Sequence, residues 1–297
     1  MYRLIAVVAV LALLGGCSPS HGTPDRPVRS RSVAGLGIEG SFGSAPILRF
    51  PDGRAPVSHR RAVVETGRGA TVRTGDLLAI DYHGQFWAGE VFDDTFAKPH
   101  PSTFPVTEGS FFPRFSESVV GARVGDRLVV VVPPPPEAIK QAKTFVFVID
   151  VIAAYRLSTP PTHGADPTGV KAPISVSGGP RQPPTVAIPE GLPEPTHPVT
   201  TVLARGRGAP VREGPVVLTI TMVDWTGRLT MSSWKDGAPT SARIEQHSSS
   251  PMLDAIRGIP VGSRVLIQLP PQNRADKQDP AQAVVIDVID QPRRGRR

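Results

Sequence analysis

Alternating apolar and polar positions mark the stretch 75–136, around which the rest of the chain is organised. Leu78, Ile80 and Tyr82 fall on one side of this alternation. A period of two predicts a β-strand with one buried face. The phenol of Tyr82 would lie on that face, where its hydroxyl needs a hydrogen-bond partner.

Further apolar runs predict more strands and two short helices. Residues 128–132 form a hydrophobic run that stops at four prolines, and residues 144–152 form another. Helices are predicted at 112–119 and 251–257, each with proline in its first turn and glycine just past its end. Several short strands with one short helix per unit predict an α+β fold, in which a helix packs on a twisted antiparallel sheet.

The pattern occurs twice along the chain. Gly67–Gly75 is echoed by Gly206–Gly214, and Val148–Ile152 by Val285–Ile289, each about 138 residues further on. This period is far too long for a solenoid, so it predicts duplication of one domain. The expected plan is a signal peptide at 1–17, a flexible tether at 18–45, a first domain at 46–157, a Pro/Gly-rich linker at 158–183, a degenerate second domain at 184–290 and a basic tail at 291–297.

The first 17 residues read as a secretory signal, with Arg3 before an apolar run that is too short to span a bilayer comfortably. The only cysteine, Cys17, follows small residues in a pattern that resembles the lipobox of bacterial lipoproteins. The resemblance implies lipidation of Cys17 and anchoring on the extracytoplasmic side of the cell membrane. An ordinary cleaved signal with an incidental cysteine is the alternative.

Composition excludes several other classes of function. A chain of 297 residues has room for two domains, and its 34 prolines and 29 glycines indicate linkers or turn-rich β structure. The formal charge of +7 owes much to arginines in the last five residues, which we expect to be solvated; no basic stripe with interleaved aromatics indicates nucleic-acid binding. Histidines are scattered without metal-binding spacing, and no phosphate-loop motif is present. Gly35–Gly40 matches a dinucleotide fingerprint on paper, but we interpret it as linker because no strand precedes it. We expect no metal, no cofactor and a monomer.

Several motifs in the first unit agree in order and spacing with a known family. They are Gly75-Asp76 followed by Tyr82 and Gly84, then Phe92-Asp93, Gly125-Asp126-Arg127 and Thr144-Phe-Val-Phe147. Over residues 46–157 the chain resembles the FKBP-type peptidyl-prolyl cis-trans isomerases. The resemblance implies two FKBP-like domains, each a twisted antiparallel sheet wrapped on one short helix.

Isomerisation of an X-Pro bond needs no nucleophile, because it is a rotation slowed by delocalisation of the amide nitrogen lone pair. A dry aromatic pocket that accepts the proline ring favours the twisted amide over the planar one. By resemblance, the residues expected to act in catalysis are Tyr82, Phe92, Asp93 and Phe115, and those expected to bind the substrate are Phe104, Phe111, Phe112 and Phe147.

Two departures from the family pattern bear on activity. Phe115 stands where the family usually has Trp, and the short segment after the prolines offers only Ile139 for the family's covering loop. In the second unit we place the counterparts of Tyr82, Phe92-Asp93 and Phe115 at Thr221, Thr230-Met231 and Met252, so that unit is expected to be non-catalytic. The predicted function is a lipid-anchored isomerase acting on proline-containing segments of exported proteins; the alternative is a non-catalytic binding or chaperone module.

Overall fold

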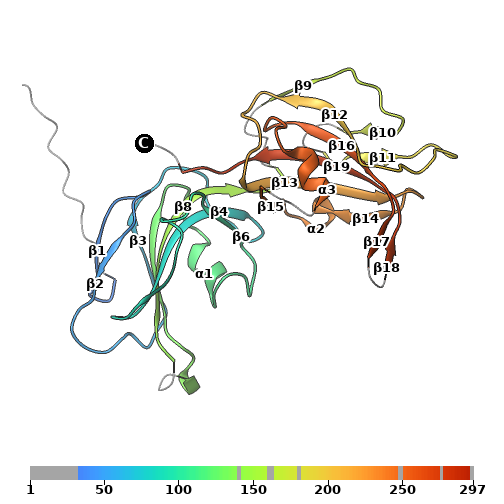
Figure 1. Cartoon of the computed structure of the whole chain (residues 1–297). Helices are drawn as coiled ribbons and strands as arrows, with labels where there is room; N and C mark the ends of the chain where they lie inside the picture. The colour runs from blue at the N-terminus through green and yellow to red at the C-terminus, as the bar shows by residue number, and fades with distance from the viewer. Residues whose placement is uncertain are drawn as a thin grey trace, which may run out of the picture.

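A computed structural model describes residues 33–138, 142–158, 164–178, 182–246, 250–274 and 277–294. Cys17 and Ile139 lie outside the described residues. The described residues form two large antiparallel sheets, one in an N-terminal half and one in a C-terminal half, together with three two-stranded sheets and few helices (Figure 1). Among the described residues, no helix has the length and apolar character needed to cross a membrane.

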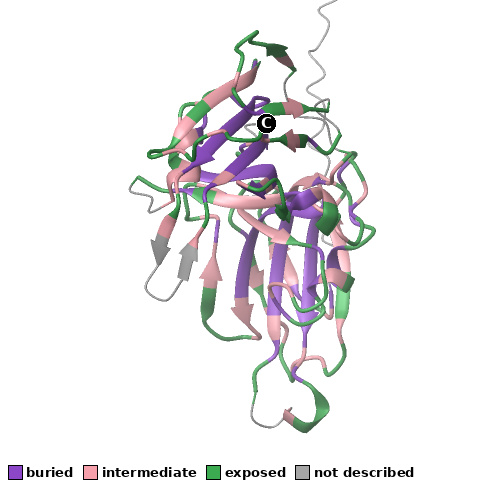
Figure 2. Ribbon diagram, turned by 90° about the vertical axis from the view of Figure 1, so that its right-hand side faces the viewer, coloured by how far each residue is buried: buried purple, intermediate pink, exposed green. Residues whose placement is uncertain are grey.

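The N-terminal half is built on a six-stranded sheet with the order β3-β7-β8-β4-β5, and β6 pairs with β4. Every residue of β7 is buried, and β8 and β4 are buried over most of their length, so these strands form the centre of the sheet (Figure 2). The elements are β1 (Gly37–Glu39), β2 (Ile47–Arg49), β3 (Arg60–Glu65), β4 (Leu77–Phe86), β5 (Val91–Asp94), β6 (Ser102–Pro105), α1 (Phe115–Val119), β7 (Arg127–Val132), the 3-10 turn η1 (Pro136–Ala138) and β8 (Phe145–Tyr155).

The C-terminal half repeats this strand order with β14-β13-β19-β16-β12, to which β9 is added at the edge and β15 beside β13. Its described residues form two short helices where the sequence predicted one, since a turn after β14 is helical here. The elements are β9 (Ala165–Pro167), β10 (Ser175–Ser177), β11 (Thr185–Ala187), β12 (Val199–Gly206), β13 (Gly214–Asp224), β14 (Leu229–Ser232), α2 (Ser233–Asp236), β15 (Thr240–Ile244), α3 (Pro251–Ile256), β16 (Arg264–Leu269), β17 (Gln272–Arg274), β18 (Lys277–Asp279) and β19 (Gln282–Asp290).

The N-terminal helix is shorter than predicted because its first turn does not form. α1 begins at Phe115, and the preceding Arg114 has a left-handed backbone with a φ of 65°. Phe111 has a φ of 61°, so the backbone is outside the right-handed helical region at two positions just before the helix. Phe115 and Val119 then pack into the core beneath the sheet, against apolar residues of β4 that include Leu78 and Ile80.

The segment predicted as a tether is part of the fold from residue 33 onward. Leu36 is fully buried, and the β1–β2 hairpin packs on the outer face of the sheet over Val129, Val131 and Val146. Gly40 directly follows β1 and has a positive φ of 93°. Its carbonyl oxygen accepts a hydrogen bond from the buried side chain of Arg127. The outer face of the sheet is apolar here, and the hairpin shields it from water.

The predicted linker 158–183 also contributes to a sheet. Within its described residues, β9 pairs with β12 and β10 forms a hairpin with β11, and Ile174 is buried under this hairpin. Arg264 donates to the carbonyl of Gly178 as Arg127 does to that of Gly40. Both halves therefore carry a covering hairpin held by a buried arginine.

The two halves pack on each other through the faces of β4 and β8 on one side and β13 and β19 on the other. An apolar cluster joins Leu77 and Ala79 to Val217 and Ile289. The hydroxyl of Tyr155 donates to Asp290 at 2.6 Å. The basic tail also differs from the prediction at its first residues, because Arg294 is not solvated but paired with Asp81 of the N-terminal half.

Candidate functional site

The expected polar pair does form. β4 carries Tyr82 and β5 carries Asp93, and the tyrosine hydroxyl donates to Asp93 Oδ2. Lys98 Nζ donates to the other carboxylate oxygen at 2.7 Å, as does the backbone N–H of Asp94 at 2.9 Å. The two strands therefore hold side by side the phenol and the carboxylate that the resemblance assigned to catalysis.

The surroundings of this pair fix its protonation at neutral pH. Burial raises the pKa of Asp93, but hydrogen bonds from Lys98 and Tyr82 outweigh burial and leave the pKa below its usual 3.8. Burial and the hydrogen bond to Asp93 raise the pKa of Tyr82. The site therefore presents a neutral phenol beside an ionised carboxylate.

The expected aromatic residues lie together in one cluster behind the polar pair. Phe112 stacks on Phe147 with ring centroids 4.1 Å apart, and Phe115 lies edge-on to Phe112 at 5.3 Å. Phe92 meets Phe147 edge-on at 5.6 Å. This aromatic cluster consists of Tyr82, Phe92, Phe104, Phe111, Phe112, Phe115 and Phe147.

Phe111 lies in the middle of the aromatic cluster. Its ring stacks on Phe104 at 4.0 Å and lies 4.5 Å from the ring of Tyr82. It also lies 5.4 Å from Phe115 and 5.8 Å from Phe147. The ring of Phe111 thus lies against these four residues, all of which the resemblance assigns to catalysis or substrate binding.

Two further aromatic residues extend the cluster toward the end of the sheet, and the sequence reasoning missed both. Phe86 lies 5.0 Å from Phe92 and 5.4 Å from Phe145. Phe92 is 40% exposed, so these rings form an accessible aromatic strip beside the polar pair. Phe145 and Phe147 are two residues apart in β8 and therefore lie on the same face of the strand. This spacing could have indicated from the sequence that Phe145 belongs with the cluster.

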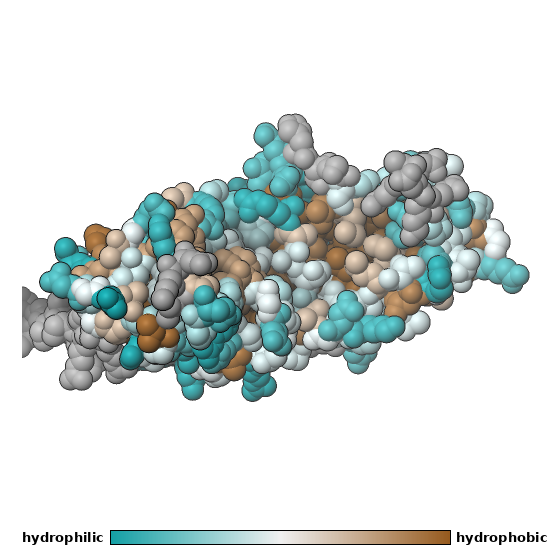
Figure 3. Space-filling view, turned by 90° about the horizontal axis from the view of Figure 1, so that it is seen from below, coloured by the Kyte–Doolittle hydropathy of each residue, from teal (hydrophilic) through white to brown (hydrophobic). Residues whose placement is uncertain are grey.

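The same positions of the C-terminal half lack this chemistry. Strand register makes Ile220, not Thr221, the counterpart of Tyr82, because Ser233 Oγ accepts from Ile220 N as Thr95 Oγ1 accepts from Tyr82 N. Here β13, β16 and α3 border a cavity of about 250 Å³, with Met252 in its lining. Seen from below, apolar side chains gather on the underside of this half (Figure 3).

A larger cavity of about 630 Å³ lies elsewhere in the C-terminal half, under residues 165–178, and is remote from the aromatic cluster. Its lining is mostly aliphatic, and its buried charges, Arg264 and Asp287, already pair with each other. Across the described ranges, no three His, Cys, Asp or Glu side chains are placed to hold a metal ion. The polar pair and aromatic cluster are therefore the best candidate for a site.

An antiparallel sheet with a short helix carries the Tyr82–Asp93 pair and the aromatic cluster. Residues 69–152 match the family described as FKBP-type peptidyl-prolyl cis-trans isomerase. The polar pair and every aromatic ring expected at the site lie within the matched residues.

Two curated relatives match over part of the chain. FK506-binding protein 2 of Yarrowia lipolytica is 31% identical over 62 residues, which cover 21% of this chain and 43% of that protein. The trigger factor of Cereibacter sphaeroides is 37% identical over 70 residues, which cover 24% of this chain and 15% of that protein. The chain thus spans less than half the length of either relative.

Two solved structures overlap partly with the chain. FkpA from Escherichia coli gives a TM-score of 0.29 at 22% identity, over 34% of this chain and 50% of that one. A peptidyl-prolyl cis-trans isomerase from Pseudomonas syringae gives 0.27 at 17% identity, over 33% of this chain and 76% of that one.

Proposed function

We propose that the chain is a peptidyl-prolyl cis-trans isomerase whose site is the aromatic cluster and polar pair of the N-terminal half. The observation that carries the proposal is the hydrogen bond between Tyr82 and Asp93 at the edge of that cluster. The carboxylate of Asp93 is partly exposed, and both Lys98 and Tyr82 donate to it. Its position on a partly exposed rim is suited to orienting a peptide.

The proposed mechanism is rotation in a water-poor site. Phe112, Phe115 and Phe147 would contact the proline ring, and the apolar surroundings would weaken the hydrogen bonds that stabilise a planar amide in water. The twisted amide has a localised nitrogen lone pair and a less polar carbonyl, so it loses less on leaving water. Tyr82, held in place by its hydrogen bond to Asp93, would orient the peptide at the rim of the site. No covalent step is involved.

We also propose that the C-terminal half is a degenerate copy of the same domain. Its strand order is the same, and its Arg264–Asp287 pair matches Arg127–Asp150 in partners and distances. The substrates would be proline-containing segments of exported proteins, reached by a chain anchored to the membrane through Cys17.

A second candidate function is a binding module without turnover. The observation that favours it is Phe111, because its ring already touches Phe104 and Tyr82 where a proline would bind. A partner would then bind to the exposed strip around Phe92 without entering the cluster.

A proline-peptide isomerisation assay on the full chain separates the two functions. We expect acceleration that falls at least tenfold in Asp93→Ala, because the hydroxyl of Tyr82 loses its partner. The matched control is Met231→Ala, at the same position of the C-terminal half, which should keep full activity. Turnover at background with retained binding of an unfolded protein would establish the binding module instead.

A further inference from the structure

Two buried carboxylates face each other across the centre of the N-terminal sheet. Asp81 of β4 and Asp150 of β8 are direct register partners, and each is 1% exposed. Two like charges this close are unfavourable unless each has a cation of its own. Arg127 of the neighbouring strand supplies one, donating to Asp150 at 2.6 and 2.8 Å.

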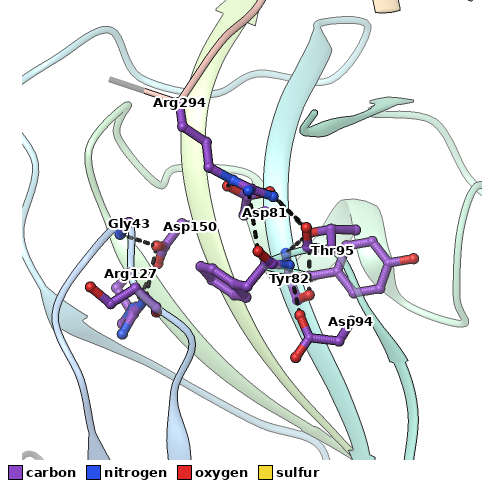
Figure 4. A network of polar contacts seen from close by, with 10 residues as sticks. Gly43, Asp81, Tyr82, Asp94, Thr95, Arg127, Asp150 and Arg294 are labelled. Atoms are coloured by element: carbon purple, nitrogen blue, oxygen red, sulfur yellow. Dashed lines mark hydrogen bonds and ion pairs between the residues drawn. The ribbon is translucent and has the colours of Figure 1, made fainter. Parts of the chain in front are cut away.

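The cation for Asp81 comes from the far end of the chain. Arg294 follows β19 and lies beyond the C-terminal sheet in sequence, yet its Nε donates to Asp81 Oδ2 at 2.6 Å and its Nη2 to Oδ1 at 2.9 Å (Figure 4). The same guanidinium donates to the carbonyl oxygens of Thr95 and Phe96. It therefore joins β4 to the segment that follows β5.

These contacts lead directly to the candidate site. The hydroxyl of Thr95 donates to Asp81 at 3.0 Å and accepts from the backbone N–H of Tyr82 at 2.7 Å. Asp93 lies two residues before Thr95. Tyr82 and Asp93 thus sit on the two segments that Arg294 ties together.

We propose that Arg294 is a positioning residue for the Tyr82–Asp93 pair. By neutralising Asp81 and holding the carbonyl of Thr95, its guanidinium fixes the spacing of the segments that carry the two side chains. The C-terminal segment of the chain is then a structural part of the site in the N-terminal half. The consequence for turnover rests on the proposed isomerase function, whereas the consequence for local order does not.

In the C-terminal half, the corresponding register pair contains one carboxylate where the N-terminal half has two. The register partner of Asp287 is Thr219, at the position of Asp81, and its hydroxyl donates to Asp287 at 3.2 Å. No carboxylate stands opposite Asp287 there, and Arg264 and Thr219 both donate to Asp287. The N-terminal half differs in having the carboxylate of Asp81 at this position, and Arg294 forms an ion pair with that carboxylate.

The test uses the full chain and four variants. Arg294→Gln should raise amide exchange in residues 81–96 at least tenfold and lower kcat of isomerisation about tenfold with a smaller change in KM. Arg293→Gln, an exposed neighbour, is the matched control and should change neither. Arg294→Lys keeps the charge without the fork of donors and should restore part of the loss.

The fourth variant, Asp81→Thr with Arg294→Gln, copies the C-terminal half and should return the exchange of residues 81–96 to within about threefold of wild type. The proposal is overturned if exchange in Arg294→Gln stays at the wild-type level, or if the double variant is no better protected than the single one. A wild-type chain without turnover would reject the isomerase function, and the exchange data would still decide the role of Arg294.

Discussion

At the scale of single residues, Phe111 is the side chain on which access to the proposed site depends. Its ring stacks on Phe104 and touches Tyr82, and its backbone is held in the left-handed region. A bulky residue in that conformation costs about 1–2 kcal/mol, so the surrounding contacts must stabilise it. A substrate proline would have to displace this ring or bind beside it.

We therefore expect Phe111→Gly to lower KM for a proline peptide by about twofold to tenfold, since a competing aromatic pair contributes about 0.5–1.5 kcal/mol. Glycine removes the ring and tolerates a φ of 61°. Phe111→Ala removes the ring but keeps the backbone cost, so it should lower KM to the same degree with less stability. Isomerisation kinetics and thermal unfolding check both. A rise in KM in both variants would show instead that Phe111 contacts the substrate.

The residue types of the site were predictable and their mutual contacts were not. Tyr82 and Asp93 could be found because they fall at family positions, and the strand pattern showed only that the phenol of Tyr82 needs a partner. The position of Phe111 could not, because it depends on left-handed backbone at Phe111 and Arg114 that no periodic pattern signals. The helix was predicted to start at residue 112 for the same reason.

At the scale of elements, the covering hairpins are held by one buried arginine each. Arg127 donates to the carbonyls of Gly40 and Ser44, both at 2.6 Å, in addition to Asp150. Burial raises the pKa of Asp150, against the hydrogen bonds from Arg127 that lower it. The ion pair thus links the β1–β2 hairpin to the centre of the sheet.

Removing this arginine should release the hairpin. We expect Arg127→Met to lower the free energy of unfolding of the N-terminal half by about 3–5 kcal/mol, because Asp150 is left as a buried, unpaired charge. Amide exchange should rise first in residues 37–49. Adding Asp150→Leu should recover much of the loss, since no charge then stays buried. Denaturant unfolding followed by exchange checks this, and equal stability of the single and double variants would contradict it.

The hairpins themselves could have been found in the sequence. Leu36, Ile38 and Gly40 recur as Ile174, Val176 and Gly178, at the same offset as the rest of the repeat. The glycine-rich composition of the first segment and the proline-rich composition of the second concealed a short strand in each. A strand of three residues has too few alternating positions to be recognised by period alone.

At the scale of the whole molecule, the sequence predicted two units but not their contact. The alternation in β4 places Leu77, Ala79 and Asp81 on the face opposite Tyr82, where a single domain would expose them to solvent. All three are buried, the first two against Val217 and Ile289 and the third under Arg294. Contacts between units separated by more than a hundred residues leave no periodic signal within either unit.

His100 makes this contact sensitive to pH. Its ring lies against Gly214 of the C-terminal half so closely that a Cβ at Gly214 would come within 2.9 Å of it. Burial lowers the pKa of His100, and Arg243, Arg293 and Arg294 lower it further, whereas Glu213 raises it. The usual value is 6.5, so the packed histidine stays neutral in a range where a free one takes up a proton.

Between the lowered pKa and 6.5, the unfolded chain therefore binds more protons at this residue than the folded chain. Stability then rises with pH across that window, and the contact weakens as the pH falls below 6.5. We expect the melting temperature to drop on acidification and the amide protection factors to fall at residues 77–79 and 214–217.

His100→Gln should remove this local pH dependence, because a neutral amide replaces the titrating ring. His59 also has a pKa lowered by burial, but it lies beside Ser118 in the N-terminal half. His59→Gln is therefore the matched control: it should reduce the pH dependence of melting while leaving that of the protection factors at residues 214–217 intact. If the protection factors at those residues still depend on pH in His100→Gln, another group titrates at the contact. The arginines that surround His100 then do not act on the contact through this histidine.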